Sequence, residues 1–134
     1  MYSMFSQDAV RVISPSQWGP PMDIVYGGAT CRAIVWPGNG GNERSLHYFA
    51  MPQGSSTVEL VHGSEAVYYV AEGSVLVSDL TDEDSRVVGV GGMFHIQIGT
   101  HYLFAAEQEN TVVLGGPCPA DIALYESLSG NMKG

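Results

Sequence analysis

The side chains of this sequence that could carry out chemistry are mostly histidines and tyrosines. It has four histidines and seven tyrosines, but only five lysines and arginines together. An imidazole titrates near neutral pH and can accept a proton, and a phenol can donate one or stabilise a developing enolate oxygen. The sequence has no GxSxG or HExxH motif, and no helix follows its glycine-rich stretches as a phosphate-binding loop requires. The residue types therefore offer acid–base groups without a recognisable nucleophile or phosphate cradle.

Short β-strands must position these groups, because β-branched and aromatic runs alternate with turn residues along most of the chain. The expected strands cover residues 30–36, 45–51, 56–62, 66–71, 74–79, 86–90, 93–98, 101–105 and 111–115. Near the C-terminus, Pro119 precedes an apolar pattern and Gly130 follows it, which predicts a short helix over about 119–129. The sequence therefore predicts an all-β sandwich or barrel with a short C-terminal helix.

The length of 134 residues suits one domain that can bury a core without a disulfide or metal. We expect a single domain over 1–134, with an N-terminal arm over 1–27 and a core barrel over about 28–118. The N-terminus lacks the basic residues of a secretory signal, so we expect a cytoplasmic protein. In that compartment Cys31 and Cys118 are expected to be two reduced thiols.

The charge balance excludes two classes of partner. Acidic residues number 14 and basic residues five, which gives a net charge of −9. Five cations cannot build a surface that follows phosphates, so no nucleic acid is expected as a partner. An anionic membrane surface is disfavoured for the same reason, and no apolar run approaches 18 residues. The expected partners are a small-molecule substrate and a second copy of the chain.

Two stretches resemble the conserved motifs of the cupin superfamily. The run from Met51-Pro52-Gln53-Gly54 through Val61-His62 to Gly73 resembles the first motif, and the run from Gly92 to His101-Tyr102 resembles the second. The resemblance implies a jelly-roll β-barrel of the kind found in small single-domain bacterial cupins. It also implies an active site inside the barrel and assembly as a homodimer. Edge strands around Val10–Ile13 and Ile24–Tyr26 are candidate interface material.

Cupins typically hold a metal with three histidines and a glutamate, and this chain has lost most of that set. Aligned without gaps from Gly54 and Gly73, the four positions are Leu60, His62, Ala66 and Tyr102. A divalent transition metal needs at least three good ligands, so no cofactor is favoured. The alternative is a divalent transition metal, as in a dioxygenase or isomerase, held by the displaced ligands His62, Glu65 and His101. Strand alternation opposes it, since Glu65 and His101 are each one residue from an inward position.

The same alignment implies what the barrel interior contains. Leu60, Ala66, Tyr68 and Phe104 are expected to line a substrate pocket. His47 and Arg32 are further candidate polar groups whose facing the pattern does not assign. Arg32 could bind a substrate carboxylate or phosphate, or form an ordinary salt bridge. A histidine facing a tyrosine across an apolar cavity suits proton transfer without a metal. The leading hypothesis is an isomerase, lyase or dehydratase, or cyclase, with His62 as base and Tyr102 as acid, acting on a small neutral or weakly polar substrate.

Two alternatives stay open beside this hypothesis. The chain could be a small-molecule-binding cupin without catalysis, in which the loss of metal ligands marks the loss of activity. His62 could also be a core residue whose nitrogens are satisfied by a carbonyl or a tyrosine hydroxyl, as buried polar groups usually are.

Overall fold

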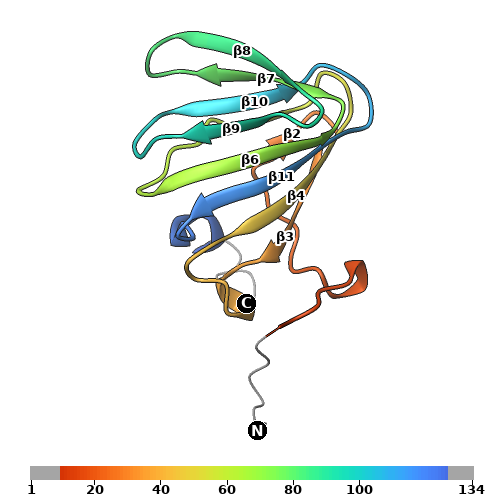
Figure 1. Ribbon diagram of the computed structural model, residues 1–134, viewed down its shortest axis with the longest axis vertical. Helices are drawn as coiled ribbons and strands as arrows, with labels where there is room; N and C mark the ends of the chain where they lie inside the picture. The colour runs from red at the N-terminus through yellow and green to blue at the C-terminus, as the bar shows by residue number, and fades with distance from the viewer. Residues whose placement is uncertain (1–9, 127–134) are drawn as a thin grey trace, which may run out of the picture.

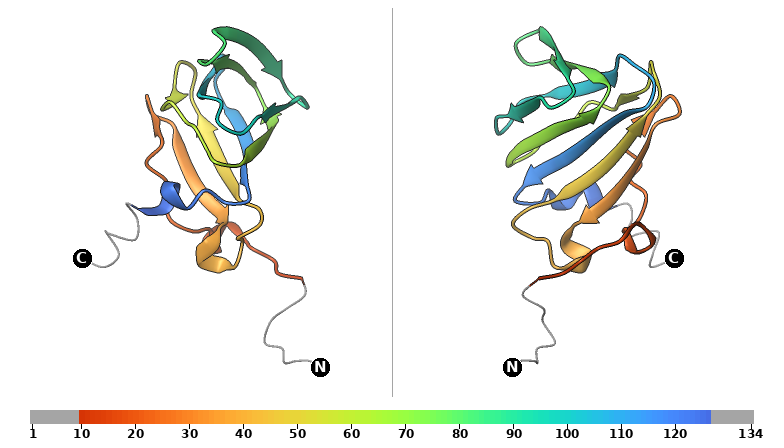
Figure 2. Two further views of the ribbon diagram at one scale, coloured as in Figure 1. Left: turned by 90° about the vertical axis from the view of Figure 1, so that its left-hand side faces the viewer. Right: turned by 45° about the vertical axis from the view of Figure 1, so that its right-hand side comes forward.

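The computed structural model describes residues 10–126, and these fold into two antiparallel sheets packed face to face (Figures 1 and 2). One sheet has the order β2-β5-β10-β7-β8 and the other has the order β3-β4-β11-β6-β9. Each sheet mixes strands far apart in the sequence, so the chain crosses repeatedly between the layers. The expectation of an all-β fold is confirmed.

The strand boundaries follow the sequence pattern closely, because turns with glycine or proline separate the apolar runs. The first sheet contains β2 (Val25–Tyr26), β5 (Ser56–Thr57), β10 (Tyr102–Ala106), β7 (Ser74–Asp79) and β8 (Asp84–Gly89). The second contains β3 (Thr30–Val35), β4 (Leu46–Met51), β11 (Thr111–Cys118), β6 (Glu65–Glu72) and β9 (Met93–Ile96). Between residues 10 and 126 there are also three short 3-10 helices, η1 (Pro15–Gln17), η2 (Pro37–Asn39) and η3 (Ile122–Tyr125).

Both ends of the described chain differ from the expected boundaries. The N-terminal arm expected over 1–27 is partly built into the barrel: β2 pairs with β5, and the side chains of Met22 and Ile24 are buried in the core. The helix expected over about 119–129 begins at Ile122 with the 3-10 turn η3 and is helical through Glu126; the rest of that range lies outside the described part. Among residues 10–126, no helix has the length and apolar character needed to cross a bilayer.

Alternation along the strands selects the residues that fill the space between the sheets. In β6, Ala66, Tyr68 and Val70 are buried, whereas Glu65 and Tyr69 are exposed. The same parity buries Tyr102 and Phe104 in β10. Aromatic rings occupy the centre, where Phe104 packs against Phe49 and Tyr68 with ring centroids about 5 Å apart. The interior is therefore a packed aromatic core that also contains a few polar side-chain groups.

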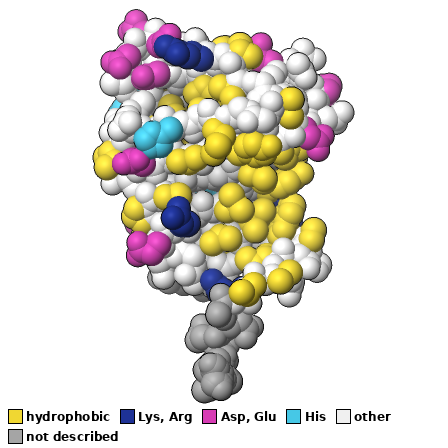
Figure 3. Space-filling model, viewed as in Figure 1, with side chains coloured by type: hydrophobic (Ala, Val, Ile, Leu, Met, Phe, Trp, Pro, Cys, Tyr) yellow, Lys and Arg dark blue, Asp and Glu magenta, His cyan; other side chains and the backbone are white. Residues whose placement is uncertain are grey.

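The second sheet is also apolar on its outer face. Figure 3 shows hydrophobic side chains gathered over the face formed by β6, β11 and β4. These outer-face residues include Leu46, Val67, Tyr69, Met93 and Leu114, which line a shallow groove together with Arg44. Sheets that face water on one side usually alternate apolar and polar residues, so this face is unusually apolar for a free surface.

Close packing of β11 on β6 depends on a glycine. A Cβ at Gly115 would collide with the carbonyl oxygen of Val67 and lie 2.7 Å from the Cα of Tyr68, and Gly115 has a positive φ of 149°. We expect Gly115→Ala to lower the free energy of unfolding by about 3 kcal/mol or more, because the backbone of two central strands must separate. Urea denaturation of the wild type and of Gly115→Ala measures this difference in the free energy of unfolding.

The matched control is Gly89→Ala in β8, where an added Cβ meets nothing within 4 Å. This control is expected to change stability by less than about 1 kcal/mol. Equal stability of the two variants would show that β11 and β6 do not pack as described.

Candidate functional site

Four polar side chains form a continuous hydrogen-bonded chain inside the barrel. The imidazole of His62 lies between two of them, with Nδ1 at 2.7 Å from Asp121 Oδ2 and Nε2 at 2.7 Å from the hydroxyl of Tyr102. The Tyr102 hydroxyl is in turn 2.7 Å from the hydroxyl of Tyr68. We call this set, Tyr68–Tyr102–His62–Asp121, the polar chain.

Strand pairing brings these residues together. Leu60 forms an isolated bridge with Tyr102, and its N–H and carbonyl bond to the Tyr102 carbonyl and N–H at 2.7 and 2.9 Å. His62 lies two residues beyond Leu60 and therefore faces the same interior as Tyr102. Asp121 comes from the other end of the chain, immediately before η3, and its second oxygen caps that helix by accepting the N–H of Ala123.

For a neutral imidazole at His62, one set of hydrogen-bond directions satisfies every group of the polar chain. A carboxylate only accepts, so His62 Nδ1 carries a proton and donates it to Asp121. In the neutral imidazole Nε2 is then an acceptor, and the Tyr102 hydroxyl donates to it. The Tyr68 hydroxyl donates to Tyr102. Every member of the polar chain is then satisfied, and the lone pair on His62 Nε2 accepts the Tyr102 proton.

Burial controls the ionisation of both tyrosines. Desolvation raises the pKa of Tyr102; the hydrogen bond from Tyr68 opposes that rise in part and the charge of Asp121 adds to it. Desolvation also raises the pKa of Tyr68 well above its usual value, with further contributions from Tyr102. Both phenols are therefore protonated at neutral pH.

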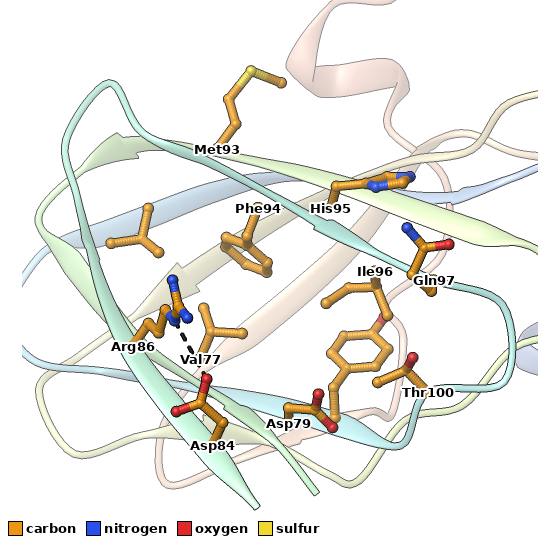
Figure 4. A pocket seen from close by; sticks show the side chains of 12 residues that line it. Val77, Asp79, Asp84, Arg86, Met93, Phe94, His95, Ile96, Gln97 and Thr100 are labelled. Carbon is orange, nitrogen blue, oxygen red and sulfur yellow. Dashed lines mark hydrogen bonds and ion pairs between the residues drawn. The ribbon is translucent and has the colours of Figure 1, made fainter. Parts of the chain in front are cut away.

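A pocket of about 320 Å³ opens between the edge strands β8 and β9 (Figure 4). Tyr102 belongs to its lining. Its walls are apolar, formed by Val77, Val88, Phe94 and Ile96. Its polar rim includes Asp79, Asp84 and Arg86. Arg86 Nε lies 3.3 Å from Asp84 Oδ2, and both side chains are largely exposed. Tyr102 is thus shared by the pocket and the polar chain.

The structure brings most of the predicted site residues into the interior. Leu60, Ala66, Tyr68 and Phe104 are all buried between the sheets with His62 and Tyr102. One detail differs from the prediction. His62 and Tyr102 do not face one another across a cavity; they are in direct contact, and Tyr102 is fully buried.

Arg32 is not in the interior, which corrects the expectation that it could bind substrate there. It alternates with the buried Cys31 and Ala33, so its side chain lies on the outer side of β3. Its guanidinium donates to the carbonyls of Gly19 and Trp18 at 2.8 and 3.0 Å. Arg32 therefore links the N-terminal segment to β3 through these two hydrogen bonds.

His47 is buried in β4 but makes a separate contact. Its Nε2 lies 2.7 Å from the hydroxyl of Tyr125 in η3, and its Nδ1 has no hydrogen-bond partner among the described residues. Desolvation, and secondarily the nearby His62, lowers the pKa of His47 to about 4. His47 is therefore neutral at pH 7.

The displaced metal ligands are not brought together. Glu65 is exposed and bonds to His95 at 2.5 Å, and His101 is exposed and bonds to Glu59 at 2.7 Å. Within residues 10–126, no group of three or more His, Cys, Asp or Glu side chains could hold a metal ion. His62 Nε2 is also engaged by Tyr102. The residues of this site do not fit the metal that cupins typically hold, because the strand alternation that buries Ala66 and Tyr102 turns Glu65 and His101 outward.

Sequence reasoning missed Asp121 and Tyr125. The apolar pattern at 122–128 was interpreted for helix packing alone, although Asp directly before such a pattern is a helix-capping signal. That signal locates the carboxylate at the start of η3 without revealing that its other oxygen reaches His62. Only the fold shows that contact, because 59 residues separate the two side chains.

Known proteins are similar to this chain in structure. No protein-family model matches it, and no curated protein matches it by sequence. A cupin-like protein from Thermotoga maritima has a TM-score of 0.64 and 18% identity, covering 88% of this chain and 84% of its own. An RmlC-like cupin from Shewanella frigidimarina has a TM-score of 0.64 and 18% identity, covering 83% of this chain and 93% of its own. The polyketide cyclase RemF from Streptomyces resistomycificus has a TM-score of 0.63 and 20% identity, covering 79% of this chain and 76% of its own.

These likenesses show the fold. The two packed sheets of this chain are a cupin-type jelly roll, as the two sequence motifs led us to expect. At 20% identity or less, the solved structures say nothing about which reaction this chain carries out.

The burial of His47 predicts a specific pH dependence of stability. The unfolded chain binds a proton at this residue below pH 6.5, whereas the folded chain does so only below about pH 4. Stability should therefore fall as the pH falls through this window, by about 3 kcal/mol from His47 alone. We expect His47→Gln to remove that part of the pH dependence in urea denaturation between pH 7 and 4. The exposed His95→Gln is the control, and a slope unchanged in His47→Gln would contradict the burial described.

Proposed function

We propose that this chain, which has the fold of the cupins, is an enzyme that transfers protons on a small organic substrate without using a metal. The observation that carries the proposal is the hydrogen bond between His62 Nε2 and the Tyr102 hydroxyl, supported on the far side by Asp121. A carboxylate behind an imidazole fixes its tautomer and stabilises its charged form, an arrangement that recurs wherever histidine acts as a base.

The polar chain can move a proton in balanced steps. A substrate proton passes to the Tyr102 oxygen while the proton of Tyr102 passes to His62 Nε2. The resulting imidazolium is stabilised by Asp121, and the negative charge left on the substrate is stabilised by the hydroxyl of Tyr102. The reverse movement returns the proton to another carbon or to a leaving group. Isomerisation, elimination and cyclisation all follow from this pair of steps.

The pocket supports a neutral or weakly polar substrate. Its inner walls are apolar, and its rim carries two carboxylates against one guanidinium, which is already paired with Asp84. An anion entering this rim meets net negative charge from a chain that carries −9 overall. The volume of about 320 Å³ is at the lower end of small-molecule sites. The likeness of the fold to that of a polyketide cyclase adds cyclisation to the reactions worth testing.

The homodimer expected from the sequence stays a prediction, and the structure offers a surface for it. The apolar outer face of β4, β6 and β11 suits an interface better than the N-terminal segment, where Val10 and Val12 are single exposed side chains. We expect light scattering to give twice the chain mass of 14.3 kDa, and Tyr69→Lys on this face to shift it toward one chain. A monomer at micromolar concentration would contradict the prediction.

The proposed activity can be tested before the natural substrate is known. A panel of small neutral ketones and lactones is incubated with the protein in D₂O, and deuterium incorporation is followed by NMR. We expect the protein to accelerate exchange for at least one compound, and Tyr102→Phe to lower that acceleration by about 10²- to 10⁴-fold. Tyr69→Phe, on the exposed outer face of β6, is the matched control and should keep full activity.

Three outcomes would contradict the proposal. Exchange that is equal in Tyr102→Phe would place the chemistry elsewhere. A compound that raises the melting temperature with no detectable exchange would favour a binding protein without catalysis. One tightly bound metal per chain, lost in His62→Ala, would favour the metal-dependent alternative.

A further inference from the structure

One short C-terminal segment supplies partners to both buried histidines. Asp121 bonds to His62 in the polar chain, and four residues later Tyr125 bonds to His47. His62 and His47 come from different parts of the barrel, and each contact has a length of 2.7 Å. The two contacts are therefore linked mechanically through η3, which carries Tyr125 and is capped by Asp121.

Within the described residues, the side chains of Tyr125 and Leu124 pack this segment against the core, and Tyr125 is the more deeply buried. The backbone is tied down ahead of Asp121, where Ala120 N–H bonds to Asn42 and the Pro119 carbonyl accepts the Ser64 hydroxyl. Beyond Asp121, Ile122 is 60% exposed and Tyr125 is the only buried residue of η3. A short helical turn gains little stability from its own hydrogen bonds, so the position of η3 depends on side-chain contacts.

The site that receives Tyr125 is rigid. His47 lies in β4 between two paired strands, opposite Ala33 of β3 and Gly115 of β11. The ring of Tyr125 packs between His47 and Trp36, with centroid distances of 5.9 and 5.5 Å. An added Cβ at Gly116 would lie 3.2 Å from His47 Nδ1, so the backbone of β11 also closes on the imidazole. The hydroxyl of Tyr125 therefore reaches a fixed point in the sheet.

The hydrogen bond to Tyr125 is the one polar contact that His47 makes within residues 10–126. With Nδ1 unpartnered, the less costly arrangement keeps the proton on Nε2 and donates it to Tyr125, since an unpaired buried acceptor is tolerated better than an unpaired donor. Loss of the Tyr125 hydroxyl would leave both nitrogens of a buried imidazole without partners.

We propose that the His47–Tyr125 hydrogen bond is a latch that positions Asp121 against His62. His47 and Tyr125 are then positioning residues, which act on the reacting groups only through η3 and Asp121. The inference rests on the proposed function, since its consequence is that the latch keeps His62 in the Nδ1–H tautomer with Nε2 available as a base. It also gives a role to a buried histidine that the polar chain does not use.

The test measures the tautomer of His62 directly and needs no substrate. Two-bond ¹H–¹⁵N correlation spectra of the whole ¹⁵N-labelled chain distinguish Nδ1–H from Nε2–H for each histidine. In Tyr125→Phe we expect the ratio of Nδ1–H to Nε2–H at His62 to fall by about tenfold, the effect of one lost charge-assisted hydrogen bond. Asp121→Asn should produce the same change by removing the carboxylate itself.

The matched control is Ile122→Ala, an exposed change in the same segment that should leave both histidines unaltered. A second pair of variants tests the latch from the other side: His47→Leu should reproduce Tyr125→Phe, whereas His47→Gln keeps a side-chain donor and should restore the ratio. A His62 ratio unchanged in both Tyr125→Phe and His47→Leu overturns the latch. This readout is independent of deuterium exchange, so a failure of the latch and a failure of the proposed activity are distinguishable.

Discussion

The arrangement of this protein depends on the need to satisfy polar groups inside a packed aromatic barrel. His62, Tyr102 and Tyr68 are all buried, and each unpaired polar atom at such a depth would cost free energy. The polar chain meets this requirement by passing hydrogen bonds in one direction, from Tyr68 through Tyr102 and His62 to Asp121. The same polar chain can transfer a proton, because the Asp121 carboxylate at its end is partly exposed and stabilises the charge that forms on His62.

Both sheets and the C-terminal segment contribute to this chain. Tyr102 comes from β10 in one sheet, Tyr68 from β6 in the other, and Asp121 from the segment that follows β11. The apolar pocket at the β8–β9 edge reaches only Tyr102 among the members of the chain. Both Tyr102 and His62 are buried away from bulk water.

The sequence predicted much of this architecture and less of the site. Strand periodicity located eight strands to within a few residues, whereas the strand expected over 56–62 is only Ser56–Thr57. Alternation correctly placed Glu65 and His101 outside the barrel. The two motifs predicted that His62 and Tyr102 share the interior. The direct contact between them could not be predicted, since it depends on the Leu60–Tyr102 bridge. The outward placement of Arg32 and the roles of Asp121 and Tyr125 depend on contacts between residues distant in sequence, which local patterns do not record.

The central claim is that His62 presents an unprotonated Nε2 to the Tyr102 hydroxyl because Asp121 holds the proton on Nδ1. Neutron diffraction from crystals exchanged into D₂O at neutral pH would locate these hydrogens directly. The account predicts deuterium on His62 Nδ1 directed at Asp121, and a Tyr102 O–D bond directed at His62 Nε2. Deuterium on His62 Nε2 pointing at the Tyr102 oxygen would contradict it, because His62 could then not accept the proton of Tyr102.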